Sequence, residues 1–204
     1  MLLIILTIAS YFVGSIPTGF VLAKLKGVDI RNVGSGNIGA TNISRVLGIK
    51  YAMLVGFLDF LKGALPTLVA LQLLTGNKFL LVALAALFGH VFPITLRFRG
   101  GKGVATFAGS FLIVAGIENF LLFSILWIVT LFLTRVMSLT NLIVSIIIIC
   151  FYVLVFGSLP RFYYVFLAAL LIWFSHRENI RRLISGKEAK LNIPDLHKLL
   201  AKVG

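Results

Sequence analysis

Residues 51–75 read Tyr-Ala-Met-Leu-Val-Gly-Phe-Leu-Asp-Phe-Leu-Lys-Gly-Ala-Leu-Pro-Thr-Leu-Val-Ala-Leu-Gln-Leu-Leu-Thr. A helix of ~20 mostly apolar residues is long enough to cross the hydrocarbon core of a bilayer. This stretch exceeds that length and carries only two charges, Asp59 and Lys62, three residues apart. Because charges in hydrocarbon are costly, we expect the two side chains to face the interior of a bundle and to pair. The stretch therefore predicts a membrane-spanning helix.

Six further apolar runs share this character, although the last four are short. With the first stretch they make seven: Leu2–Ala23, Tyr51–Thr75, Phe79–Leu96, Val104–Gly116, Phe120–Thr134, Leu142–Gly157 and Phe162–Ser175. Short runs can recruit flanking residues or lie where the bilayer thins around the protein. We predict an all-α, polytopic membrane protein with seven transmembrane helices, forming a single domain over residues 1–204.

The composition excludes other classes of protein. Of the 204 residues, 60% are hydrophobic and 12% are charged, whereas soluble domains carry ~25% charged residues. Disorder requires low hydrophobicity, and an ordinary soluble domain requires more polar surface than this chain has. The formal net charge is +13, but no nucleic-acid partner is expected, because such a binder gathers its cations on a solvated face.

The basic residues predict which side of the membrane each loop faces. With seven spans, 16 of the 19 Lys and Arg residues fall in one set of connections, two in the other set, and Lys62 within a span. By the positive-inside rule the rich set is cytoplasmic, so the N-terminus is outside and the C-terminus inside. The cytoplasmic connections are also the longer ones, so the functional residues are expected there. After Pro194, residues 194–203 predict a small interfacial amphipathic helix.

The first cytoplasmic connection contains Gly34-Ser35-Gly36-Asn37-Ile38-Gly39-Ala40-Thr41-Asn42-Ile43-Ser44-Arg45. A glycine-rich turn that opens a helix, here from about Asn37, presents free amides and the positive end of the helix dipole to a phosphate. Gly34, Gly36 and Gly39 also fit a dinucleotide-binding fingerprint, but no βαβ unit surrounds them, so we reject that interpretation. A plain interhelical loop stays an alternative.

The second cytoplasmic connection contains His90 and, further on, the segment Gly100-Gly101-Lys102-Gly103. The glycines and Lys102 form a second candidate anion site, although the spacing is not that of a P-loop. The neighbouring Arg97 and Arg99 are equally suited to lipid headgroups. His90 suits either a structural role or proton chemistry.

Two more connections carry polar candidates near the membrane surface. Ser138 and Asn141 could cap a helix or donate to a ligand oxygen. His176 and Asn179 lie one helical turn apart, in a basic segment whose arginines could bind anionic lipid. The six acids are scattered without metal-ligand spacing, so neither a metal nor another cofactor is expected. The residues alone predict a site for one or two phosphates and leave the reaction open.

In this order the motifs resemble the bacterial acyl-phosphate:glycerol-3-phosphate acyltransferase family. The resemblance covers nearly the whole chain and is carried by these segments: Gly14–Gly19, Gly34–Arg45, Asp59-x-x-Lys62-Gly63, Gly89–Thr106, Ser138-Leu139, and His176–Leu183 with Gly186 and Glu188. It implies a seven-span enzyme of the bacterial cytoplasmic membrane, with its active site open to the cytoplasm. The implied partners are acyl phosphate, glycerol 3-phosphate and membrane lipid, with no protein partner.

The implied reaction transfers a fatty acyl group from acyl phosphate to the 1-hydroxyl of glycerol 3-phosphate. It yields lysophosphatidic acid and phosphate, the first step of phospholipid synthesis. Carried over by position, the residues implied to hold glycerol 3-phosphate are Ser35, Arg45, Lys102, His176 and Asn179. The backbone amides around Gly36–Thr41 and Gly101–Gly103 are implied to hold the phosphate of the acyl phosphate. The other residues expected to bind substrate are Asn37, Gly39, Asn42, His90, Gly100, Ser138 and Asn141, and Ser35, Arg45, Lys102 and His176 are expected to be catalytic. Asn141 stands where the family often has serine.

Two alternatives differ in class or donor. A transporter of phosphate esters would need polar residues along several spans, and apart from Asp59 and Lys62 the spans nearly lack them. An acyltransferase that uses acyl-CoA would share the acceptor site. The proton acceptor is also open, because a substrate phosphate oxygen and the His176 imidazole are both suited to it.

Overall fold

The computed structural model describes residues 1–191, which form helices and no strand. All seven predicted apolar runs are helical. They correspond to α1 (Leu2–Gly14) with α2 (Thr18–Leu25), α4 (Ile49–Leu73), α5 (Phe79–Val91), α6 (Val104–Ala115), α7 (Ile117–Thr134), α8 (Met137–Phe151) and α9 (Leu159–Ser175). The shorter elements are η1 (Ile30–Asn32), α3 (Ala40–Leu47), η2 (Gly76–Lys78), η3 (Ile94–Leu96), the π-helical turn η4 (Tyr152–Phe156) and α10 (Arg177–Ile184). The interfacial helix predicted over residues 194–203 lies outside the described residues.

Five helical segments within residues 1–191 are long and apolar enough to cross a membrane. A sixth is added if α9 and α10, which meet at an angle of 63°, form one broken span. The remaining apolar helix, α6, has 12 residues and is therefore ~18 Å long, well short of a ~30 Å hydrocarbon core. The prediction of an all-helical protein with several spans is confirmed, whereas the seventh crossing stays a prediction.

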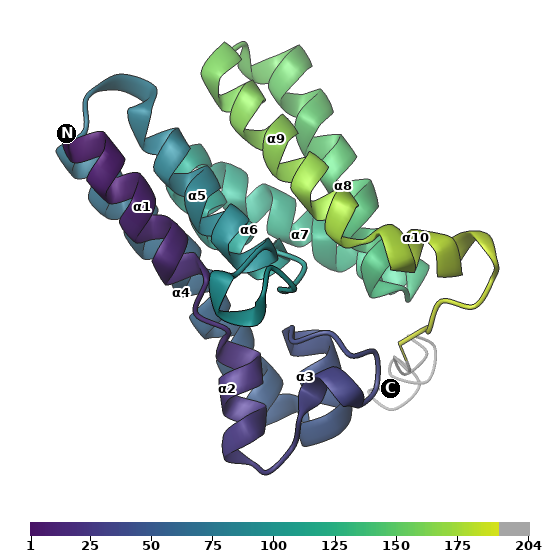
Figure 1. The fold of residues 1–204 in the computed structure, drawn as a ribbon. Helices are drawn as coiled ribbons and strands as arrows, with labels where there is room; N and C mark the ends of the chain where they lie inside the picture. Colours follow the sequence, from purple (N-terminus) through teal and green to yellow (C-terminus); the bar gives the residue numbers. More distant parts are fainter. Residues whose placement is uncertain (192–204) are drawn as a thin grey trace, which may run out of the picture.

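The two ends of the helical bundle differ (Figure 1). The N-terminus and the turn at η2 lie at one end of the long helices, whereas α2, α3 and α10 lie at the other. The connection from α5 to α6 folds back at this second end, close to α2. The glycine-rich segments that the sequence singled out therefore gather at the α2–α3–α10 end.

Two glycines bring α4 and α6 into close contact. A Cβ atom added to Gly63 would lie 1.9 Å from the carbonyl oxygen of Thr106, and one added to Gly109 would lie 2.0 Å from that of Phe60. Small residues let the backbones of membrane helices approach in this way. The contact places the Asp59–Lys62 turn of α4 beside the first turn of α6.

Aromatic side chains form much of the core between α6, α7, α8 and α9. The ring of Phe111 packs edge-on against Phe123 and Tyr152, at centroid distances of 5.8 and 6.2 Å. The hydroxyl groups of Ser110 and Tyr164 lie 2.7 Å apart, so the polar atom of a fully buried tyrosine is satisfied. This core fixes the positions of the helices that surround the site.

Candidate active site

A cavity of about 750 Å³ lies between α3, α10 and the two glycine-rich loops and extends among the long helices. Its polar part is lined by Gly34, Ser35, Asn37, Gly39, Ala40, Thr41, Asn42, Arg45, Asp59, His90, Lys102, Gly103, Ser138, Asn141, His176, Asn179, Arg182, Lys187 and Glu188. Its apolar part includes Phe107, Phe111, Phe120, Phe123, Trp127, Ile128, Val144, Ile148 and Ile172, from α6, α7, α8 and α9. One cavity therefore joins a polar end, rich in cations, to an apolar arm inside the bundle.

The structure brings 13 of the 16 predicted site residues to this cavity; the other three, Gly36, Gly100 and Gly101, do not line it. These 13 residues come from α3, α5, α8, α10, the bend between α9 and α10, and the two glycine-rich loops. Four charged residues also line it that were not among the predicted site residues: Asp59, Arg182, Lys187 and Glu188.

Asn42 organises the first glycine-rich loop. Its amide nitrogen donates to the carbonyl oxygens of Ile30, Val33 and Asn37 at 2.9–3.3 Å, and its Oδ1 accepts from the Ser35 amide at 2.9 Å. The side chain is 1% exposed. Its hydrogen-bonding capacity is thus used within the protein, so Asn42 shapes the site rather than offering free donors to a ligand.

The second glycine-rich loop is tied to the end of α5. The amides of Gly100 and Gly101 donate to the carbonyl oxygens of Val91 and His90, both at 3.1 Å. These two amides therefore hold the loop, and the backbone donors that face the cavity come from the residues that follow. On the far side of the loop, the carbonyl oxygen of Lys102 accepts from the Ser175 hydroxyl at 3.1 Å.

Two helix N-termini open onto the cavity. Gly39 precedes α3 and Gly103 precedes α6, and neither end is capped by a side chain. The first residues of both helices line the cavity: Ala40 and Thr41 in α3, Val104 and Ala105 in α6. The first amides of a helix have no acceptor within it, and the dipole favours an anion there. α3 begins at Ala40, three residues later than predicted, because the Asn42 side chain holds the turn before it.

His176 lies at the 63° bend between α9 and α10 and is completely buried. Its Nδ1 lies 2.8 Å from the carbonyl oxygen of Ile172, which can only accept, so Nδ1 carries the proton. Nε2 then has the free lone pair and lies 3.4 Å from the amide nitrogen of Asn141. The Oδ1 of Asn141 in turn accepts from the Trp127 indole at 2.8 Å. Asn141 thus orients the imidazole.

The comparisons with known proteins all identify the same family, over nearly the whole length of the chain. The family described as glycerol-3-phosphate acyltransferase matches residues 4–186 of this chain. The chain belongs to the glycerol-3-phosphate acyltransferase family. A relative of that name from Aquifex aeolicus (strain VF5) is 43% identical over 186 residues, covering 90% of this chain and 96% of the relative. Another, from Rubrobacter xylanophilus, is 41% identical over 191 residues and covers 93% and 96%.

Solved structures of this acyltransferase family share the fold. PlsY (YgiH), described as an integral membrane glycerol 3-phosphate acyltransferase in its glycerol 3-phosphate form, superposes with a TM-score of 0.89 at 39% identity. That match covers 94% of this chain and 96% of PlsY. The lysophosphatidic acid form gives a TM-score of 0.86 at 38% identity, with 93% and 95% covered. The protein is therefore a multi-pass integral membrane member of the family.

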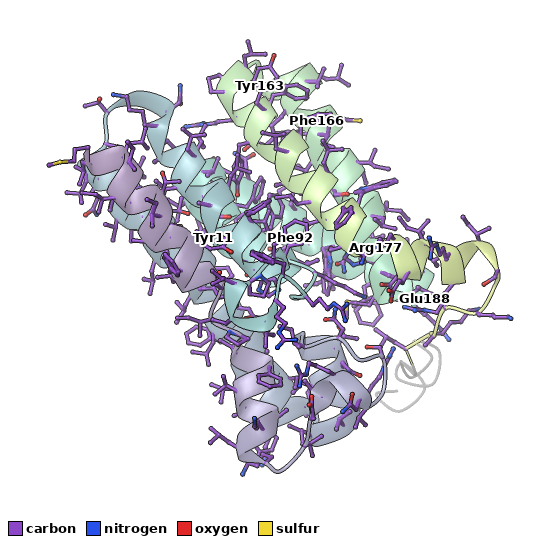
Figure 2. The ribbon with its side chains drawn as sticks, viewed as in Figure 1. Tyr11, Phe92, Tyr163, Phe166, Arg177 and Glu188 are labelled. Carbon is purple, nitrogen blue, oxygen red and sulfur yellow. The ribbon has the colours of Figure 1, made fainter. Side chains whose placement is uncertain are left out.

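Glu188 was part of the motif that carried the resemblance but was not among the predicted site residues, although it lines the cavity. Its carboxylate accepts from Ser138 Oγ at 2.7 Å, Asn179 Nδ2 at 2.5 Å and Arg182 Nε at 2.7 Å. It lies just beyond α10 (Figure 2). Burial alone would raise its pKa, but the three hydrogen bonds and the charge of Arg182 hold that pKa below its ordinary value. The signal in the sequence was an acid, one of only six, inside a basic segment.

Lys102 is one of the cations that line the cavity. Its ammonium group makes no hydrogen bond or ion pair within residues 1–191, although the residue is only partly exposed. Burial lowers the pKa of Lys102 from 10.5 to about 8; Glu188 opposes this shift, and Arg182 and Arg45 reinforce it. Within the described residues, no hydrogen-bonded or ion-paired group therefore competes with an anion for this ammonium group.

Proposed function

We propose that this protein transfers a fatty acyl group from acyl phosphate to the 1-hydroxyl of glycerol 3-phosphate, the first step of phospholipid synthesis. The hydroxyl oxygen attacks the acyl carbonyl carbon and forms the ester bond. The bond from that carbon to the bridging phosphate oxygen breaks, and phosphate leaves with the electron pair. The hydroxyl proton passes to a phosphate oxygen. The products are lysophosphatidic acid and inorganic phosphate.

The shape of the cavity is the observation that carries this proposal. Two helix N-termini and the cations Arg45, Lys102, Arg182 and Lys187 line its polar end, and an apolar arm leads away from that end into the bundle. Helix N-termini and cations suit phosphate, and the arm suits a hydrocarbon chain. A substrate pair with two phosphates and one acyl chain matches this arrangement.

The proposed roles follow this division of the cavity. Ser35, Arg45, Lys102, His176 and Asn179 hold glycerol 3-phosphate, and the amides at the starts of α3 and α6 hold the phosphate of the donor. Gly36, Gly100 and Gly101 shape these turns from behind the cavity wall. Positioned cations and amides stabilise charge that develops in the transition state. An acyl phosphate is already activated, so positioning and charge stabilisation supply most of the catalysis.

A phosphate oxygen of the substrate is the proposed proton acceptor. The competing base is Nε2 of His176, which has a free lone pair but faces the Asn141 amide. We assign His176 to binding and orientation of the acceptor hydroxyl. Asn141 and Ser138 support this site through His176 and Glu188, respectively.

Purified protein incubated with glycerol 3-phosphate and either acyl phosphate or acyl-CoA tests the donor. We expect lysophosphatidic acid from acyl phosphate and none from acyl-CoA, measured by mass spectrometry. Product from acyl-CoA alone would replace the proposed donor by the thioester. Uptake of glycerol 3-phosphate into liposomes without any product would favour a transporter instead.

The pH profile reports on Lys102. Since its pKa is about 8, the side chain is charged below that pH and loses its charge as the pH rises. We expect kcat/KM to fall as the pH rises through 8 to 9, because the neutral amine binds phosphate weakly. In Lys102→Arg the cation persists, so the fall should move upward by at least one pH unit. If Lys102→Arg leaves the pH profile unchanged, the titration of Lys102 does not cause the fall in kcat/KM.

We propose the bacterial cytoplasmic membrane as the location, with seven spans and the active site facing the cytoplasm. The basic connections support this orientation through the positive-inside rule. In this arrangement α6 is the short span, beside an aqueous cavity that reaches into the bundle from the cytoplasmic side. The acceptor enters from the cytoplasm, and the acyl chain reaches the apolar arm from the lipid.

A further inference from the structure

A cluster of buried polar side chains lies where α2, α4, α5 and α6 meet, beside the cavity. The ammonium of Lys62 lies 2.8 Å from Oδ1 of Asp59, one turn earlier on α4. Thr18 of α2 donates its hydroxyl to the same oxygen. The exposed fractions of Asp59, Lys62 and His90 are 3%, 6% and 5%. A buried ion pair with these extra hydrogen bonds compensates its two charges, which would be costly if left alone.

The cluster also fixes the break between α1 and α2. Pro17 lacks an amide hydrogen and interrupts the helical hydrogen bonds. Lys62 donates to the carbonyl oxygen of Ile16 at 2.8 Å, which satisfies an acceptor at this break. α4 and the α1–α2 junction are therefore joined through the Lys62 ammonium group as well as through the Thr18–Asp59 hydrogen bond.

His90 connects the cluster to the loop that carries Lys102. Its Nδ1 lies 3.1 Å from the hydroxyl of Thr106 on α6 and 3.8 Å from Oδ1 of Asp59. The opposite side of the ring rests on Gly101, where an added Cβ would lie 2.1 Å from Nε2. The carbonyl oxygen of His90 accepts from the Gly101 amide at 3.1 Å. The ring and the backbone carbonyl group of His90 thus hold Gly101, the residue directly before Lys102.

We propose that His90, held by Thr106 and the Asp59–Lys62 pair, is a positioning residue for Lys102. The cluster sets the path of the backbone from Gly100 to Gly103, and thereby the direction of the ammonium group. Lys62 and Thr106 lie behind the cavity wall, whereas Asp59 and His90 also reach the cavity. This inference rests on the proposed role of Lys102. It changes the role of His90, which the sequence suggested as a substrate-binding residue, to that of a support behind the loop.

Thr106 offers the sharpest test, because it is fully buried and does not line the cavity. Thr106→Val keeps the shape of the side chain and removes its hydrogen bond to His90, so an effect on catalysis must pass through the protein. Misplacement of a functional group by ~1 Å can cost about 100-fold in rate. We expect kcat/KM to fall about 10-fold in Thr106→Val and less than about 3-fold in Thr106→Ser, which keeps the hydroxyl.

A double-mutant cycle separates positioning from general damage. If the cluster acts through Lys102, Thr106→Val should change kcat/KM less than about 3-fold in a Lys102→Ala background. The same loss in both backgrounds, or no loss in the wild-type background, would overturn the proposal. An enzyme that makes no lysophosphatidic acid before any substitution would instead refute the proposed function, so the two failures are distinguishable.

Further variants distinguish an effect on catalysis from misfolding of the protein. Ser10→Ala removes a buried 2.7 Å hydrogen bond to the carbonyl oxygen of Val82, between α1 and α5 and outside the cluster. We expect it to lower the thermal unfolding temperature and leave kcat unchanged. If Thr106→Val does not fold, the double variant Asp59→Asn/Lys62→Met takes its place, because it removes the ion pair without changing the net charge. Its effect on kcat/KM is again compared in the wild-type and Lys102→Ala backgrounds. An equal loss in both backgrounds, or no loss in the wild-type background, would overturn the proposal.

Discussion

Lys102→Ala is expected to lower kcat/KM by about 10³-fold, because removing one positioned donor to developing charge commonly costs 10²–10³-fold or more. The Lys102 ammonium faces the cavity without a hydrogen-bonding or ion-pair partner in residues 1–191, so it is available to a substrate phosphate. Steady-state rates of lysophosphatidic acid formation from acyl phosphate measure the effect.

Lys50 provides the control for Lys102. It lies exposed at the start of α4 and does not line the cavity. Lys50→Ala removes the same charge from the same chain, and we expect less than a twofold change in kcat/KM, as is usual for a surface side chain. A comparable loss in both variants would show that the net charge of the protein, rather than a cation in the cavity, controls the rate.

Glu188→Ala is expected to have the second largest effect, about 100-fold on kcat/KM, since misplacement of supporting groups by ~1 Å can cost that much. The substitution leaves the donors of Ser138, Asn179 and Arg182 without their shared acceptor. Asn179 and Arg182 then no longer hold fixed positions at the cavity. Kinetics with both substrates, together with a thermal unfolding measurement, test this expectation.

Glu178 is the matched acid for Glu188. It lies exposed on α10 and does not line the cavity. Glu178→Ala should retain nearly full activity. If Glu188→Ala unfolds at the wild-type temperature and keeps wild-type kinetics, the three hydrogen bonds have no function in positioning the site.

The fold class could be predicted because a bilayer imposes length and polarity on each helix. The apolar runs were identified correctly as helices, and the expected pairing of Asp59 with Lys62 is confirmed by their 2.8 Å contact. The crossing of α6 could not be settled in this way, since its 12 residues do not reach across a bilayer by length alone. The start of the helix after the first glycine-rich loop was also predicted wrongly. Asn42 holds the turn before this helix through hydrogen bonds to the carbonyl oxygens of Ile30 and Val33.

The residues of the candidate site were easier to predict than their roles. Short motifs placed 13 of 16 residues at one cavity, because glycines and cations signal anion binding locally. Roles depend on tertiary contacts. Glu188 meets Ser138 across 50 positions of sequence, and His90 faces Thr106 and Gly101 rather than open solvent. Periodicity along one chain carries no information about such pairings.

The most direct test of the account measures two products in one time course. Purified protein receives acyl phosphate and glycerol 3-phosphate, and lysophosphatidic acid and inorganic phosphate are quantified together in wild type and in Lys102→Ala. The account predicts one phosphate released for each lysophosphatidic acid formed, and an equal loss of both products in the variant. Phosphate release without lysophosphatidic acid, or full acyl transfer by Lys102→Ala, would contradict it.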